Sequence, residues 1–107
     1  MSDYEAIQGT WKVVGGSKEG LTIPIGPKKF GSKVLYELNP SKTPKEIDLK
    51  HRRPRARHRF SGQGIYSLDG DTMTLCWVYE GERPKAFPAS GDSEQNLLVL
   101  KRVRSTS

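Results

Sequence analysis

The chain has few of the residues and segments that mark several large classes of protein. Its single cysteine, Cys76, excludes an internal disulfide, and cysteine-poor chains are typical of reducing compartments. No apolar run approaches the roughly 20 residues that a helix needs to cross a bilayer, so we expect no membrane span. The opening "MSDYEAIQGTW" has neither the basic nor the apolar region of a signal peptide. These absences predict a cytoplasmic protein.

Helical periodicity is also scarce. Apolar residues recur mainly at every second position, which is typical of strands with one buried face. The expected strands are 9–15, 21–25, 33–39, 45–50, 57–68, 72–80 and 96–103, after one short helical turn at 3–8 capped by Ser2 or Asp3. A chain of 107 residues suits a single domain. The pattern predicts one all-β antiparallel barrel or sandwich over residues 1–107.

The stretch "GIYSLDGDTMTLCW", residues 64–77, predicts a hairpin. Asp69-Gly70 suits a two-residue type I′ turn, which needs positive φ at both central positions. Asp69 and Asp71 could instead form a carboxylate pair for metal binding or acid–base chemistry. Two acids are too few oxygen ligands for calcium, so we favour a structural role for both.

Cys76, the single cysteine, is a candidate nucleophile, and for that role it would need a nearby base. The two histidines, His51 and His58, both lie in an arginine-rich run, and no Cys/His grouping has zinc spacing. We favour a buried, inert thiol. The sequence therefore predicts a protein that is not an enzyme, with no cofactor and no metal.

Several motifs resemble a known family. Gly9-Thr10-Trp11 looks like the Gly-x-Trp signature of lipocalins, in which a late arginine, here Arg102, packs its guanidinium on the tryptophan and closes the barrel. The longer series "QGTW", "LNPSKTPKEIDL", "GIYSLDGDTMTLCW", "RPKAF" and "LLVLKR" is similar to an uncharacterised lipocalin-like domain family best known from planctomycete bacteria. The resemblance spans roughly residues 7–102 and implies a bacterial, lipocalin-like (calycin-type) up-and-down barrel. It implies no reaction, because the family has no established activity.

One segment departs from that family. Between Gly20 and Lys33 the chain is shorter by about one hairpin. This leaves open a shortened or incomplete barrel, whose open edge could pair with a second copy as a homodimer.

Large side chains on the expected inner face could line or fill the barrel. If they line it, they could bind a small apolar ligand; with so short a chain we favour a filled interior. The candidates are Trp11, Tyr36, Tyr66, Met73 and Trp77.

The positive charge is concentrated in one run, "KHRRPRARHR", residues 50–59. This run has six Lys and Arg residues and no acid, and the other twelve basic residues of the chain balance its twelve acidic ones. If the run is extended, its arginines could bind the phosphates of a polyanion, and such binding would be sensitive to salt. Alternatively, the same charges on the edge of a sheet would discourage aggregation. The candidate polyanion-binding residues are Arg52, Arg53, Arg55, Arg57 and Arg59.

Two functions therefore compete at the level of sequence. The first is a non-enzymatic binding or interaction module that takes a small apolar ligand or a protein partner. The second, less favoured, is a module that binds nucleic acid or another polyanion through residues 50–59.

Overall fold

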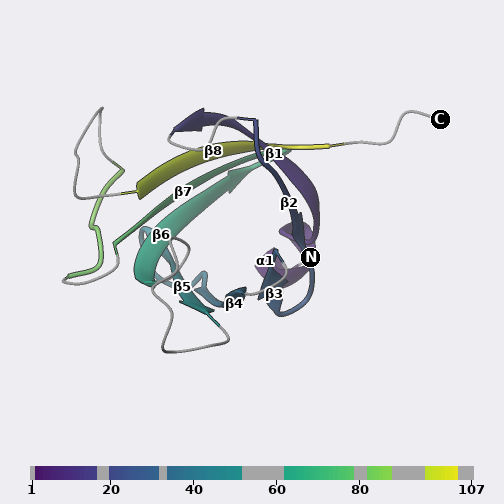
Figure 1. The fold of residues 1–107 in the computed structure, drawn as a ribbon. Coiled ribbons are helices and arrows are strands. Elements are labelled where there is room, and N and C mark those ends of the chain that lie inside the picture. The colour runs from purple at the N-terminus through teal and green to yellow at the C-terminus, as the bar shows by residue number, and fades with distance from the viewer. Residues whose placement is uncertain are drawn as a thin grey trace.

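The chain forms an eight-stranded, closed, antiparallel barrel with one short helix (Figure 1). The structure is a computed structural model, and it describes residues 2–16, 20–31, 34–51, 62–78, 82–87 and 96–103. The elements are α1 (Asp3–Ala6), β1 (Gly9–Gly16), β2 (Thr22–Ile25), β3 (Lys29–Phe30), β4 (Val34–Asn39), β5 (Lys45–His51), β6 (Gly62–Asp69), β7 (Thr72–Val78) and β8 (Asn96–Arg102). The predicted all-β, up-and-down architecture is confirmed.

The barrel is complete, although the segment after Gly20 is short. Each strand pairs with the next along the chain, and β8 closes the barrel by pairing with β1 from Trp11↔Arg102 to Gly16↔Leu98. The two-residue strand β3 bridges β2 and β4 through the pairs Ile25↔Phe30 and Phe30↔Val34. Among the described strands there is thus no open edge, and the premise of a homodimer formed through one is removed.

Alternation along the strands places one side chain in two inside the barrel. The burial of β4, for example, alternates between buried and exposed from Val34 to Asn39. The buried cluster combines branched aliphatic side chains with large rings: Ile7, Trp11, Val13, Ile23, Ile25, Phe30, Val34, Tyr36, Leu38, Ile47, Leu49, Tyr66, Met73, Leu75, Trp77, Leu98 and Leu100. Its burial is the main source of the stability of the fold.

The N-terminal plug, residues 2–8, covers one end of the barrel. Ser2 caps α1 by accepting a hydrogen bond from the Glu5 amide, and Ile7 is fully buried. The Tyr4 ring stacks on that of Tyr36 with centroids 5.9 Å apart, and its hydroxyl accepts a bond of 2.8 Å from the Leu38 amide. The predicted helical turn is confirmed, and of its two candidate caps, Ser2 and Asp3, the structure shows Ser2.

A half-buried carboxylate, that of Asp3, fastens the plug to the barrel wall. One oxygen of Asp3 accepts from the Tyr66 hydroxyl at 2.7 Å and lies 3.0 Å from the Lys45 ammonium. Burial acts to raise the pKa of Asp3, but these two partners outweigh it and hold the pKa below its ordinary value. Burial and the Asp3 carboxylate together raise the pKa of Tyr66 well above its usual range.

We expect this cluster to make stability depend on pH on the acid side. Because the folded state binds the Asp3 proton less readily than the unfolded state, the contribution is present above the ordinary carboxyl pKa of about 4 and is lost as the pH falls through the lowered pKa. The difference in urea midpoint between the wild type and Asp3→Asn should be largest at about pH 6 and should shrink at about pH 2. When both proteins also carry Tyr66→Phe, the difference in urea midpoint at about pH 6 should be smaller. A difference in midpoint that does not change with pH would contradict the assignment.

The hairpin between β6 and β7 turns one residue later than predicted. Asp69 pairs with Thr72, so the central residues are Gly70 and Asp71. Gly70 has φ of +59°, and no described residue other than glycine has a positive φ. This fits a type II′ turn, in which only the first central residue needs positive φ, rather than the expected type I′.

Two strands approach each other unusually closely at Gly64 of β6. Gly64 lies opposite Trp77 of β7, and a Cβ at Gly64 would sit 2.3 Å from the Cys76 carbonyl oxygen and 2.7 Å from the Trp77 Cβ. Only glycine fits at this position without moving the β7 backbone.

No helix in the described part of the chain is long and apolar enough to cross a membrane.

Candidate functional site

The structure has three places that bear on function, of which the first is the closed end of the barrel. Trp11 and Arg102 are direct partners across β1 and β8, and the guanidinium carbon of Arg102 lies 4.4 Å from the centroid of the Trp11 ring. The structure thus brings together the two residues expected to close the barrel.

Arg102 also binds the plug. Its Nη1 donates to the Gln8 carbonyl at 2.8 Å and its Nη2 donates to the Ala6 carbonyl, while its Nε donates to Asp71 at 3.2 Å. Trp11 contributes a further bond of 2.8 Å from its indole N–H to the Ile7 carbonyl. One guanidinium therefore joins the last strand, the plug and the β6–β7 turn.

The geometry of this end of the barrel explains why the Gly-x-Trp motif begins with glycine. Gly9 has φ of +134°, a conformation that other residues rarely adopt, and a Cβ there would meet Arg102 Nη1 at 2.9 Å. Gly9 thus gives the guanidinium room above Trp11.

The second place is the barrel interior. All five residues considered for an apolar ligand are buried, with between 0 and 4% of their surface exposed, and all five belong to the packed core: Trp11, Tyr36, Tyr66, Met73 and Trp77. Polar atoms of this set also bind the wall or the plug: the Tyr36 hydroxyl donates to the Gly26 carbonyl at 2.6 Å, the Tyr66 hydroxyl to Asp3 and the Trp11 indole to the Ile7 carbonyl. These side chains support the barrel from within.

The thiol and the carboxylates considered for catalysis lie apart from one another where the structure describes them. Cys76 points outward from β7, yet it is 0% exposed, so its thiol has no access to a substrate. Asp69 is exposed at the end of β6, and Asp71 is engaged with Arg102. His58 and the side chain of His51 lie outside the described part of the structure, as do Arg52, Arg53, Arg55, Arg57 and Arg59.

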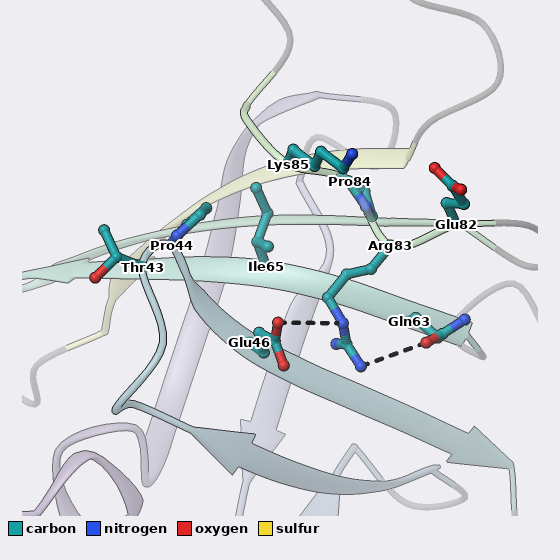
Figure 2. Close-up of a pocket in the computed structure, with 9 residues that line it drawn as sticks. All are labelled: Thr43, Pro44, Glu46, Gln63, Ile65, Glu82, Arg83, Pro84 and Lys85. Atoms are coloured by element: carbon teal, nitrogen blue, oxygen red, sulfur yellow. Dashed lines mark hydrogen bonds and ion pairs between the residues drawn. The ribbon is translucent and has the colours of Figure 1, made fainter.

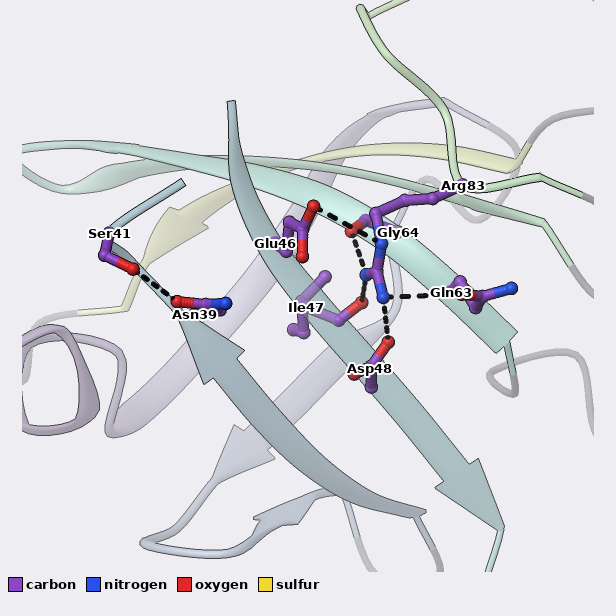
Figure 3. Close-up of polar contacts among 8 residues, drawn as sticks. All are labelled: Asn39, Ser41, Glu46, Ile47, Asp48, Gln63, Gly64 and Arg83. Atoms are coloured by element: carbon purple, nitrogen blue, oxygen red, sulfur yellow. Dashed lines mark hydrogen bonds and ion pairs between the residues drawn. The ribbon is translucent and has the colours of Figure 1, made fainter. Parts of the chain in front are cut away.

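The third place, which sequence analysis missed, is on the outer wall over β5 and β6. The strap, residues 82–87, carries Arg83, whose side chain reaches to both strands (Figure 3). Arg83 Nη1 donates to the carbonyls of Ile47 and Gly64 at 3.1 and 2.9 Å. Since these two residues are partners across β5 and β6, the guanidinium straddles the ladder.

Acidic and amide side chains complete the environment of Arg83. Nη2 donates to Asp48 at 2.7 Å and to Gln63 at 3.4 Å, and Nε lies 3.7 Å from a carboxylate oxygen of Glu46. A guanidinium has five N–H donors in a fixed plane, and each nitrogen of Arg83 here faces at least one acceptor. Arg83 is therefore a staple that holds the strap to the wall, and its side chain is only 21% exposed.

The strap forms one side of a groove of about 770 Å³, the outer groove. The turn containing Thr43 and Pro44 forms the opposite side, and that turn is held by a bond of 2.7 Å from Ser41 Oγ to Asn39 Oδ1. Glu46, Gln63 and Ile65 form the floor, and residues 82–85 provide the strap side. Figure 2 shows Ile65 at the centre, with Thr43 and Pro44 to its left and Arg83 and Gln63 to its right.

Arg83 gave only a weak signal in the sequence. The "RP" of "RPKAF" belongs to the motifs that carry the family resemblance, and "KEID" places Glu46 and Asp48 on the polar face of a strand. Neither pattern reveals that Arg83, 35 positions after Asp48, contacts both Asp48 and Glu46. The contact depends on how the strap returns to the barrel. The chain matches no protein-family model, no curated protein and no solved structure.

Proposed function

We propose that this domain is a non-enzymatic binding module and that it holds a segment of a protein partner in the outer groove. The observation that carries the proposal is the Arg83 staple, which fixes one side of an open groove to a rigid barrel wall. Sites on rigid elements with locked supporting side chains are the ones that bind with defined geometry. A lipocalin-like family membership, a bacterial origin and a cytoplasmic location are parts of the same proposal.

The groove suits a partner segment better than the interior suits a small apolar ligand. Its volume lies within the roughly 300–1,000 Å³ typical of ligand sites, and it combines apolar surface from Pro44 and Pro84 with charged side chains at its rim. The five interior candidates, in contrast, are committed to the core. An apolar ligand inside would have to displace that packing.

The proposal can be tested with a panel of N-acetyl amino acid methylamides, one for each side chain, titrated into ¹⁵N-labelled protein. We expect saturable shifts of the amides of Thr43, Gln63, Ile65 and Lys85 with at least some members of the panel. Thr43→Trp, which fills the groove from an exposed position, should abolish these shifts. Thr22→Trp, at an exposed position on β2, is the matched control and should leave them unchanged.

Two results would overturn this assignment. If no member of the panel shifts the groove amides, the groove is not a binding site. If an apolar probe such as decanoate instead shifts the indole N–H signals of Trp11 and Trp77, the ligand site is the interior.

A second candidate, polyanion binding, is favoured by the charge on the described surface next to the basic run. Lys29, Leu35 and Lys50 are successive partners across β3, β4 and β5 and are all exposed. They form a row on the outer wall that leads to the end of β5, where residues 52–59 follow. Phosphate contacts from such a row would add to those proposed for the arginines.

Fluorescence anisotropy with labelled single-stranded and duplex DNA tests this candidate. We expect binding at about 50 mM salt that weakens steeply by about 200 mM. The double variant Lys29→Gln, Lys50→Gln should weaken it, whereas Lys12→Gln, Lys101→Gln, which removes two exposed lysines paired across β1 and β8, should not. No binding at low salt removes the candidate.

A further inference from the structure

The charged groups of the outer groove are not equally available to a ligand. Arg83 is already surrounded by acceptors from β5 and β6. Of the other charged side chains that line the groove, Glu82 and Lys85 are exposed. Glu46 is different, because its side chain is only 30% exposed.

Glu46 is a half-buried carboxylate without a hydrogen bond in the described part of the chain. Within that part, its charged contact is Arg83 Nε at 3.7 Å, which is too long for a hydrogen bond. A carboxylate removed from water gains from each donor that it acquires, and charged donors give the strongest bonds. A cationic donor that entered the groove would therefore be favoured at Glu46.

The local charge also favours a cation. Among the described residues of the groove and its staple, the three acids Glu46, Asp48 and Glu82 outnumber the two bases Arg83 and Lys85, although the chain as a whole carries +6. Because salt screens distant charges more than near ones, a cation in the groove is attracted by these acids more than it is repelled by the rest of the chain.

The apolar walls of the groove favour a cation that is carried on an alkyl chain. Pro44 is half-buried on one side of the groove and Pro84 is buried on the other, with Ile65 beneath (Figure 2). An alkyl stem can lie along these surfaces while its charged end reaches a carboxylate, as lysine and arginine side chains commonly do.

We propose that the outer groove is specific for a basic side chain, lysine or arginine, of an extended segment in a protein partner. The proposal rests on the proposed function of the groove and names the chemistry that it recognises. The alkyl stem packs between Pro44 and Pro84, and the cation binds Glu46, with Glu82 adding negative charge at the rim.

Matched tripeptides test the specificity. The blocked peptides Gly-Lys-Gly, Gly-norleucine-Gly and Gly-acetyllysine-Gly share the stem and differ at its end, and each is titrated against ¹⁵N-labelled protein. We expect the lysine peptide to bind about fivefold more tightly than the norleucine peptide, a ratio that corresponds to about 1 kcal/mol. The acetyllysine peptide should behave like the norleucine peptide, because acetylation removes the charge.

Variants of the acids locate the effect. Glu46→Gln should remove the preference for lysine, and Glu37→Gln, an exposed acid on β4 that does not line the groove, should leave it intact. Because Glu46 also contacts Arg83, Glu82→Gln provides a second test: Glu82 is exposed at the rim, and its loss should reduce the preference by about twofold.

The results separate this inference from the function on which it rests. Equal binding of the lysine and norleucine peptides at the groove overturns the specificity and leaves a binding groove. A lysine preference that survives Glu46→Gln and Glu82→Gln also overturns it. The absence of groove shifts with every tripeptide and every member of the methylamide panel overturns both.

Discussion

Replacing Arg102 by methionine is expected to lower the free energy of unfolding by about 3 kcal/mol and the melting temperature by about 15 °C. Methionine keeps an apolar stem like that of arginine but has no guanidinium to donate to the carbonyls of Ala6 and Gln8. Hydrogen bonds to charged groups contribute about 1.5–3 kcal/mol each, and the cation over Trp11 adds about 1 kcal/mol. The remaining exposure of Arg102, 24% of its side chain, keeps the expected total below the sum of these values.

Two control variants separate the contributions of Arg102. Arg102→Lys keeps the charge but not the planar fork, so it should recover only part of the loss. Asp71→Asn removes the charge that pairs with Arg102, in an ion pair that is half-exposed at Asp71, and should cost less than about 1 kcal/mol. Urea denaturation followed by tryptophan fluorescence measures all three, and a loss below 1 kcal/mol for Arg102→Met would show that the barrel end is closed without this residue.

Replacing Gly64 by alanine is expected to destabilise the domain by about 3 kcal/mol, at the upper end of the effects of overpacking. The new methyl would overlap the Cys76 carbonyl oxygen, which belongs to the β7 backbone and cannot rotate away. Relief requires β6 and β7 to separate where Gly64 pairs with Trp77. The shift would also move the Gly64 carbonyl that binds Arg83.

Gly26 offers a matched control for this substitution. A Cβ at Gly26 would meet nothing within 4 Å, and its φ lies outside the positive region. Gly26→Ala should therefore change stability by less than about 1 kcal/mol and is expected to raise it, because it restricts the unfolded chain. Equal effects of the two alanines, measured by urea denaturation, would contradict the close approach at Gly64.

Features that depend on local pattern were predictable from the sequence. Period-two alternation located every described strand except β3, and the polar start at Ser2 and Asp3 located the helical turn that Ser2 caps. The pairing of Trp11 with Arg102 came from a resemblance, and the structure supplies its physical basis in the antiparallel register of β1 and β8.

Features that depend on distant parts of the chain were not predictable in this way. Closure by the two residues of β3 is a property of the whole ring, which no local pattern reports. The hairpin turn moved by one residue because the pairing of Asp69 with Thr72 fixes the register. Ile65 and Cys76 face outward but are buried, so alternation alone misplaces them, and the Arg83 staple joins segments that no periodicity connects.

The position of β8 between β7 and β1 has a consequence for biosynthesis. During translation the first seven strands leave the ribosome before residues 96–102 do, and until then β1 and β7 both lack a neighbour on one side. Unpaired strands are prone to associate with other chains. The nascent polypeptide is thus most vulnerable just before its last strand emerges, and premature termination upstream of Asn96 would leave an aggregation-prone product.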